Sequence, residues 1–221
     1  MTTYSITIIA SANILKIGIT ETFTANYVGS DGSSVPITDG KWGDDNDAVA
    51  TVVEATGAVT IVGVGQITIF VDYKGIRGTI LIRGIPDFQG TWSGTYAVTK
   101  CEAQGTLAAE NFCNNFPVGE VFTTTITVTQ NLAAVTGQGT MRNITQTING
   151  TIGLDGTLTL TGLPIVPEGQ DVKILFWLLR KDSPNACRGN TVEVWMKPGF
   201  TPGEGAVEGS LQEFTRTNAL Y

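Results

Sequence analysis

The sequence predicts an all-β protein of two domains, a β-sandwich over residues 1–85 and an eight-stranded antiparallel up-and-down β-barrel over residues 88–221. Short segments of alternating apolar and polar residues recur about every 8–12 residues, separated by clusters of Gly, Asn, Asp and Pro. Helical periodicity is nearly absent. The 221 residues, 42% of them hydrophobic, suffice for two ordinary β-domains with separate cores.

Seven strands are predicted in the first domain. They are rich in Val, Ile and Thr, whose β-branched side chains pack well on a pleated surface. The run from Gly84 to Asp87 ends the pattern, since Pro86 cannot donate to a ladder and Gly84 relaxes the backbone. We place the domain boundary there. The predicted strands lie near residues 4–9, 20–27, 41–43, 49–53, 58–62, 66–73 and 78–83.

Residues 4–84 carry short motifs in a fixed order: LKIG from residue 15, TFTA from 22, DG from 31, KW from 41, VATV from 49, ATGAVT from 55, GVGQITI from 63 and YKG from 73. Trp42 supplies a large apolar body for the space between two sheets. The order and spacing resemble the group 2 bacterial immunoglobulin-like family (BIG2). The chain departs from the family's usual Ser-Ser-Asn after Trp42, where it has GDDND.

The resemblance to BIG2 implies an immunoglobulin-like sandwich over residues 1–85. It also implies a role as a spacer or adhesive module, which is what these domains do on bacterial surface proteins and some phage proteins. It carries over no catalytic residues.

Eight strands joined largely by hairpins are predicted in the second domain, near residues 90–100, 120–130, 133–141, 144–152, 157–162, 171–181, 191–197 and 206–216. Such an order suits an up-and-down barrel, because closing the sheet removes both edges. An open second sandwich stays an alternative, because strand count alone does not prove closure. Gly90-Thr91-Trp92 resembles the start of many lipocalin- and avidin-like barrels. Residues 106–111 predict a short helix, with Thr106 as N-cap, that would act as a lid over the barrel mouth.

Composition excludes several classes of function. The chain has no histidine, which excludes Ser-His-Asp and Cys-His catalysis and His-ligated zinc. The net charge of −7 is spread along the chain, so we expect no nucleic-acid partner. No apolar run is long enough to span a bilayer, so we expect no membrane insertion. We predict no cofactor, no metal site and no enzymatic activity.

The opening residues alternate like a strand and lack a basic start, so they do not predict a signal peptide. We nevertheless expect an extracellular or cell-surface protein, whose signal has been removed or which is part of a longer chain. A cytoplasmic or virion-borne origin stays open.

One face of the predicted barrel strands is apolar. An eight-stranded barrel is just wide enough for one small ligand, so this face predicts either a cavity for a small apolar ligand or a filled core. The candidate lining residues are Trp92, Tyr96, Phe122, Ile126 and Ile148.

The sixth barrel strand is apolar on both faces, because Val172, Ile174, Phe176 and Leu178 alternate with Leu175, Trp177 and Leu179. Burying such a side chain is worth roughly 1.5–3 kcal/mol, so the outer face should be covered. The first domain, a second copy in a homodimer, or a surface partner protein would cover it. The interface candidates are Leu175, Trp177 and Leu179.

Cys101 and Cys113 flank the predicted lid, whereas Cys187 lies between strands six and seven. In an up-and-down barrel these two loops lie at opposite ends. Topology therefore favours a Cys101–Cys113 bridge with Cys187 free, while other pairings and three free thiols stay open. The bridge would contribute roughly 3 kcal/mol and indicates an oxidising compartment.

Two further groups of acidic residues are candidate sites. Asp44, Asp45 and Asp47 lack the ligand spacing of an EF-hand loop and predict a solvated turn. Three carboxylates on or beside barrel strands leave a glycosidase-like pair as a hypothesis: Glu120, Glu193 and Glu208. The leading hypothesis is a ligand-binding barrel carried by a spacer; a structural or interaction module with a filled barrel comes second, and a carboxylate hydrolase third.

Overall fold

The computed structural model describes residues 3–164, 172–197 and 203–218 of the chain. The protein is all-β, and it divides into two compact units, Met1–Asp87 and Phe88–Tyr221. No helix among the described residues is long and apolar enough to cross a membrane.

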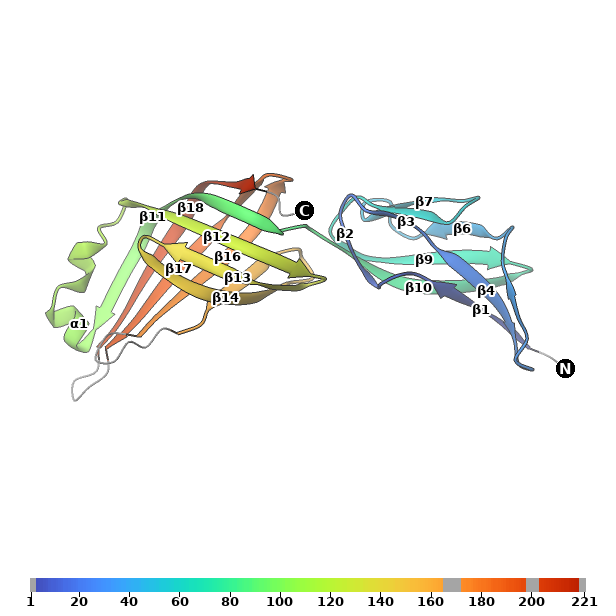
Figure 1. The fold of residues 1–221 in the computed structure, drawn as a ribbon, viewed down its shortest axis with the longest axis horizontal. Coiled ribbons are helices and arrows are strands. Elements are labelled where there is room, and N and C mark those ends of the chain that lie inside the picture. Colours follow the sequence, from blue (N-terminus) through green and yellow to red (C-terminus); the bar gives the residue numbers. More distant parts are fainter. Residues whose placement is uncertain (1–2, 165–171, 198–202, 219–221) are drawn as a thin grey trace. The chain divides into compact units, whose positions relative to one another are not determined.

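The first unit contains ten short strands in three sheets (Figure 1). One sheet has the order β1-β4-β5, the second β2-β10-β9-β6 and the third β3-β8-β7. The strands are β1 (Tyr4–Ile9), β2 (Ile14–Lys16), β3 (Thr20–Thr22), β4 (Thr24–Gly29), β5 (Ser34–Pro36), β6 (Lys41–Asp44), β7 (Ala50–Val53), β8 (Ala58–Ile61), β9 (Gly65–Tyr73) and β10 (Ile76–Ile85).

The single strand predicted over residues 20–27 is wrong, because the chain changes sheets at Phe23. β3 pairs with β8, whereas β4 pairs with β1. Phe23 between them is buried, and its backbone N–H donates to the carbonyl of Gly57 at 2.9 Å. The stretch TETFTANY over residues 20–27 has no Gly or Pro, so the sequence gives no sign of such a switch.

Trp42 lies in the apolar core of the first unit, 8% exposed. Gly57 is required beside it, because a Cβ at this position would lie 2.7 Å from the indole and the residue has φ +68°. Other buried members of the same core are Phe23, Val59, Ile61, Ile67, Ile69, Val71 and Ile82.

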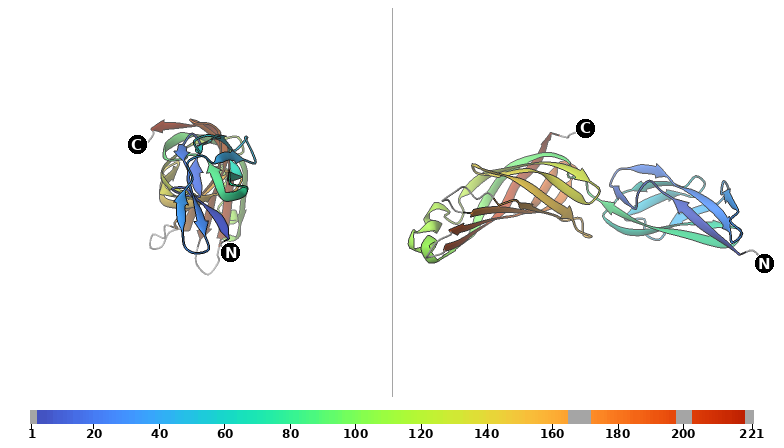
Figure 2. Two further views of the ribbon diagram at one scale, coloured as in Figure 1. Left: turned by 90° about the vertical axis from the view of Figure 1, so that its right-hand side faces the viewer. Right: turned by 60° about the horizontal axis from the view of Figure 1, so that its bottom comes forward.

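The second unit is a closed barrel in which each strand pairs with the next, β11 through β18. β18 returns antiparallel to β11, from Thr91↔Asn218 to Gln104↔Glu204, and the two lie side by side in Figures 1 and 2. The predicted eight-stranded barrel is thus confirmed, and an open second sandwich is excluded. Its strands are β11 (Gly90–Gln104), β12 (Val121–Asn131), β13 (Ala134–Met141), β14 (Ile144–Ile152), β15 (Leu158–Gly162), β16 (Val172–Ser183), β17 (Ala186–Lys197) and β18 (Gly203–Asn218).

A glutamine side chain completes the barrel wall where β15 is too short to do so. β15 ends at Gly162, so no strand of the described residues lies between β14 and β16 beyond that point. Gln146 of β14 accepts a hydrogen bond from the Leu175 backbone N–H at 3.1 Å and donates one to the Lys173 carbonyl at 2.6 Å. Its side-chain amide therefore makes the two hydrogen bonds to β16 that a backbone peptide unit of a neighbouring strand would make.

Candidate functional site

A lid covers one end of the barrel. The pairing of β11 with β12 stops at Ala97↔Val121, but its pairing with β18 continues to Gln104, so residues 98–104 project past β12. The chain then forms α1 (Gly105–Ala109) and η1 (Phe112–Asn115), seen at the end of the barrel in Figure 1. The short helix is as predicted, but Thr106 is not its N-cap. That position is Gln104, whose side chain makes no capping hydrogen bond.

A disulfide ties the lid to the barrel. Cys101 of β11 and Cys113 of η1 are bonded, with Cα atoms 5.7 Å apart, as the topology argument predicted. Cys187 is free and buried in β17. The lid is also held by an ion pair between Glu110 and Lys197.

Two lid phenylalanines enter the barrel mouth. Phe112 and Phe116 are 6% and 2% exposed, and both rings meet Trp195 edge-on, with centroids 5.4 Å and 6.1 Å away. Phe116 also meets Phe122 at 6.2 Å. The lid is therefore an aromatic plug, completed by buried Val98, Leu107 and Val207.

A charged cluster lies inside the barrel at this end. Glu193 of β17 is 0% exposed, and the Tyr96 hydroxyl donates a hydrogen bond to its Oε1. Its Oε2 accepts two long hydrogen bonds, 3.3 Å from Arg142 Nη2 and 3.4 Å from Trp195 Nε1. Burial, and then the charge of Glu193, raises the pKa of Tyr96 well above its ordinary value. Tyr96 is therefore a neutral hydrogen-bond donor at every ordinary pH.

Arg142 reaches this cluster from the turn between β13 and β14. Its backbone has φ 52°, a left-handed conformation, and its N–H donates to the Thr123 carbonyl at 2.9 Å. The guanidinium carbon lies 4.2 Å from the centre of the Phe116 ring, 5.2 Å from Phe122 and 5.8 Å from Trp195. Cation–π attraction acts over these distances.

Two buried polar atoms of this region have no hydrogen-bond partner among the residues that the structure describes, Arg142 Nε and Thr191 Oγ1. Thr191 lies two residues before Glu193 on the inward face of β17, and it is 1% exposed. Nearly all buried polar groups in proteins are paired, so two such atoms near one carboxylate are unusual.

The predicted lining residues are distributed over both ends of the barrel. Trp92, Tyr96, Ile126 and Ile148 are all 0% exposed, whereas Phe122 is partly exposed. Tyr96 and Phe122 meet at the lid end, with ring centroids 5.8 Å apart. Trp92 lies away from them and packs on Phe88 and Phe214. The structure therefore brings only Tyr96 and Phe122 into the charged cluster.

The interface candidates on β16 were assigned to the wrong face. Leu175, Trp177 and Leu179 are at most 1% exposed and point into the barrel. The outer face carries Ile174, Phe176 and Leu178, of which Leu178 is 45% exposed. Because both sets are apolar, alternation alone could not say which one faces inward; pairing with β15 and β17 decides it.

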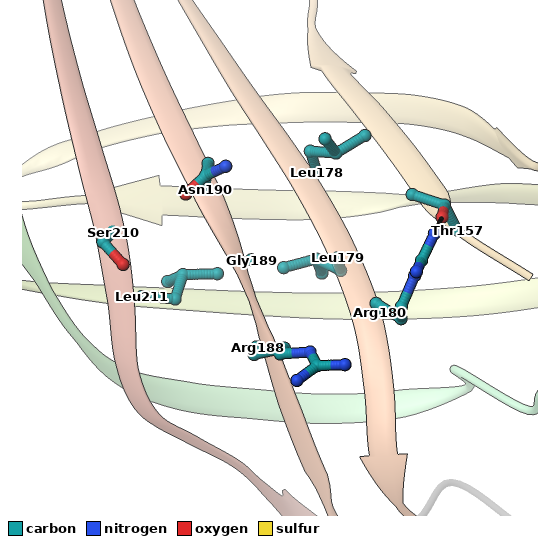
Figure 3. Close-up of a pocket in the computed structure, with 9 residues that line it drawn as sticks. All are labelled: Thr157, Leu178, Leu179, Arg180, Arg188, Gly189, Asn190, Ser210 and Leu211. Carbon is teal, nitrogen blue, oxygen red and sulfur yellow. Dashed lines mark hydrogen bonds between the residues drawn. The ribbon is translucent and has the colours of Figure 1, made fainter.

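A groove of about 440 Å³ lies on this outer face (Figure 3). It forms where the pairing of β17 with β18 is interrupted between Cys187 and Asn190. Gly189 permits the close approach there, since a Cβ would lie 1.9 Å from the Leu178 carbonyl oxygen. A second groove of about 330 Å³ shares Leu178 and Asn190. The first is lined by Thr157, Leu178, Leu179, Arg180, Arg188, Gly189, Asn190, Ser210 and Leu211.

The two arginines of the first groove already have carboxylate partners. Arg180 and Arg188 lie directly opposite each other in register. Arg180 pairs with Asp155 at 2.7 Å, and Arg188 with Asp182 at 3.1 Å. The groove is thus an apolar floor with a neutralised polar rim.

The acidic groups form neither a metal site nor a facing pair. Asp44 accepts a hydrogen bond from the Asn46 N–H at 3.0 Å and so caps its own turn, whereas Asp45 accepts one at 2.8 Å from the Thr68 N–H of β9. Within residues 3–164, 172–197 and 203–218, no group of three or more His, Cys, Asp and Glu could hold a metal ion. Glu120 and Glu208 are exposed, whereas Glu193 lies inside the barrel wall. These three do not provide the pair a glycosidase needs.

By fold, the second unit belongs to the class of closed eight-stranded up-and-down β-barrels, here with a disulfide-tethered lid. The chain matches no model of a known protein family and no curated protein. Its function must therefore be argued from its own residues.

Proposed function

We propose that this chain is a non-enzymatic binding protein in which the barrel holds a small, largely apolar ligand beneath its lid. The N-terminal domain serves as an immunoglobulin-like spacer or adhesive module that presents the barrel outside the cell. The tethered lid is consistent with that location, because disulfides persist in oxidising compartments.

The observation that carries this proposal is the cluster under the aromatic lid, in which the buried Glu193 and Tyr96 meet the partly buried Arg142. Burying an ion pair inside a barrel costs several kcal/mol per charge, and apolar side chains of similar volume would fill the same space at least as stably. A purely structural core has no need of it. A binding site does, because ligand pockets combine apolar walls with a few polar groups that orient the ligand.

Native mass spectrometry of the oxidised protein, purified from its own host, tests the proposal. We expect an additional non-covalent mass on the wild type. The mass should be lost in Glu193→Gln, which keeps the shape of the side chain, and retained in Leu178→Ala on the outer face. A wild-type spectrum with the polypeptide mass alone would contradict it.

A second candidate is an interaction module that docks a partner protein or a second copy on the outer face of β16. The half-exposed Leu178 between two grooves favours it. Burying this side chain would stabilise a complex by roughly 1–2 kcal/mol. Sedimentation of the purified protein, with Leu178→Glu as the comparison, distinguishes this role from that of the lid end.

A further inference from the structure

We propose that Arg142 occupies the head-group position of an organic-cation site, and that the ligand of the barrel carries an ammonium or guanidinium group that takes its place. This inference rests on the proposed binding function and names the chemical class of the ligand. It follows from what surrounds the guanidinium, from how loosely it is held, and from the position of the buried carboxylate.

The surroundings of Arg142 have the composition of a cation cage. Three aromatic rings lie within 6 Å of the guanidinium carbon, from Phe116 of the lid, Phe122 of β12 and Trp195 of β17. The fully buried carboxylate of Glu193 closes the cage. Aromatic faces attract a cation through their quadrupoles, and a buried carboxylate supplies the opposite charge.

Arg142 fills this cage poorly. Its hydrogen bond to Glu193 is 3.3 Å long, beyond the usual 2.7–2.9 Å of a charged pair. Among the described residues its Nε has no hydrogen-bond partner although it is buried, and its side chain remains 21% exposed. Within the same part of the chain, Glu193 Oε2 receives this bond and the 3.4 Å contact from Trp195. A cation that approached Oε2 more closely would therefore bind better than the resident side chain.

Displacing Arg142 requires no change in the barrel. The residue lies in a two-residue turn outside the ladder of β13 and β14, and its backbone is fixed by the hydrogen bond to Thr123. Rotation about its own side-chain bonds moves the guanidinium from the cage into solvent. Leu132, in the turn between β12 and β13, has the same left-handed backbone and is 47% exposed, so a side chain at such a turn is readily solvated.

The carboxylate argues for a cationic rather than an anionic head group. An anion bound to Arg142 would lie next to Glu193, and the two negative charges would repel each other in a region of low dielectric. The Lys173 ammonium lies 4.0 Å from the centre of the Trp195 ring, so this ring already lies close to two cationic side chains.

The test removes the resident cation and supplies a free one. Methylguanidinium is titrated into wild type, Arg142→Ala and the double variant R142A/E193Q, with the Trp195 indole N–H resonance as the readout. We expect R142A to bind at least tenfold more tightly than the wild type and than the double variant. Propionate, an anion of similar size, should not move the resonance. Arg142→Met, which preserves the volume of the side chain, serves if R142A does not fold.

A folded R142A or R142M that binds methylguanidinium no more tightly than the wild type overturns the inference, as does tighter binding of propionate. The wild type is also titrated with benzyltrimethylammonium and benzoate. A preference for the ammonium supports displacement of Arg142, and a preference for benzoate opposes it. If native mass spectrometry shows a retained anionic or neutral ligand, the cation assignment fails while the binding function stands. If no ligand is retained and no probe binds, both fail.

Discussion

The two ends of the barrel contain equally large aromatic side chains but satisfy their polar groups very differently. Away from the lid, the indole N–H of Trp92 donates to the Phe88 carbonyl at 2.7 Å. The Phe88 N–H in turn donates to Gln130 Oε1 at 2.7 Å, and Gln130 Nε2 donates to the Leu132 carbonyl at 3.0 Å. These three bonds are short, and the groups that they join all have partners, as in a packed structural core.

At the lid end, by contrast, hydrogen bonds to Glu193 Oε2 are longer than 3.2 Å, and within the described residues Arg142 Nε and Thr191 Oγ1 have none. The segment that covers this end is a lid held by a disulfide, not a strand of the barrel. Under the proposed function, stability and ligand binding are therefore separated along the barrel axis. One end would keep the barrel packed, and the other would retain polar groups for a ligand.

Replacing the central tryptophan of each end should show the largest difference. Trp92→Ala removes a side chain that is 0% exposed, and we expect a loss of roughly 3–5 kcal/mol in the free energy of unfolding. Trp195→Ala removes a partly exposed ring beneath the lid and should cost clearly less. Urea denaturation of both variants measures this. Equal losses would mean that the lid end is as much a structural core as the other.

Removing the disulfide should be the next largest effect, and it should be confined to the lid end. Cys101 and Cys113 are separated by 12 residues, so breaking the bridge should cost about 3 kcal/mol through the entropy of the unfolded chain. Hydrogen exchange of C101S/C113S should rise in residues 105–120 before it rises around Trp92. Cys187→Ser, in which the bridge remains, is the control for losing a thiol. Uniform acceleration along the barrel would show that the two ends are not independent.

The sequence was sufficient for what depends on pattern. Alternation and turn residues predicted the all-β class and the consecutive hairpins. They favoured a closed barrel over an open second sandwich, because a closed sheet has no edges, and the pairing of β18 with β11 decides it. Topology likewise favoured the Cys101–Cys113 bridge, with other pairings and three free thiols left open, and the structure decides that as well.

Two features could not be predicted from the sequence: which face of β16 points into the barrel, and the role of Arg142 in a turn. β16 is apolar on both faces, so its inward set could be read either way, and Leu175 was placed on the outside. Arg142 stands in an ordinary turn and gave no signal at all. Glu193 did offer one, because it shares the inward phase of β17 with Thr191 and Trp195, whereas Val192 and Val194 face outward. A charged residue in phase with buried ones marks an internal site.

The pH dependence of the free energy of unfolding should separate the two ends of the barrel further. The free thiol of Cys187 is buried at the end away from the lid. Burial raises the pKa of Cys187 from 9.0 to about 12. The folded protein thus keeps its proton at a pH where the unfolded chain releases it. The contribution of Cys187 to the free energy of unfolding is therefore complete below pH 9. It is lost as the pH rises toward 12, with a slope of at most about 1.4 kcal/mol per pH unit.

Urea denaturation at several pH values between 8 and 11 measures that slope. We expect it to be shallower in Cys187→Ala than in the wild type, whatever the variant's stability at pH 8. Tyr96 contributes in the same direction at the lid end, since its pKa is also raised by burial. Tyr96→Phe is therefore the matched control. If C187A leaves the slope unchanged, the thiol is not shielded from water and that end is less tightly packed than its contacts indicate.

The smallest effect concerns the outer wall, which belongs to neither end. Leu178→Ala should change the free energy of unfolding by less than about 1 kcal/mol, because the side chain is 45% exposed, whereas its neighbour Leu179, at 0%, should cost roughly 2–5 kcal/mol. The pair lies on one strand and differs only in the face it occupies. A loss above 2 kcal/mol for L178A, together with a concentration-dependent melting temperature, would show that a second copy covers this face in solution. The outer groove, and not the lid end, would then be the leading candidate for the functional surface of the barrel.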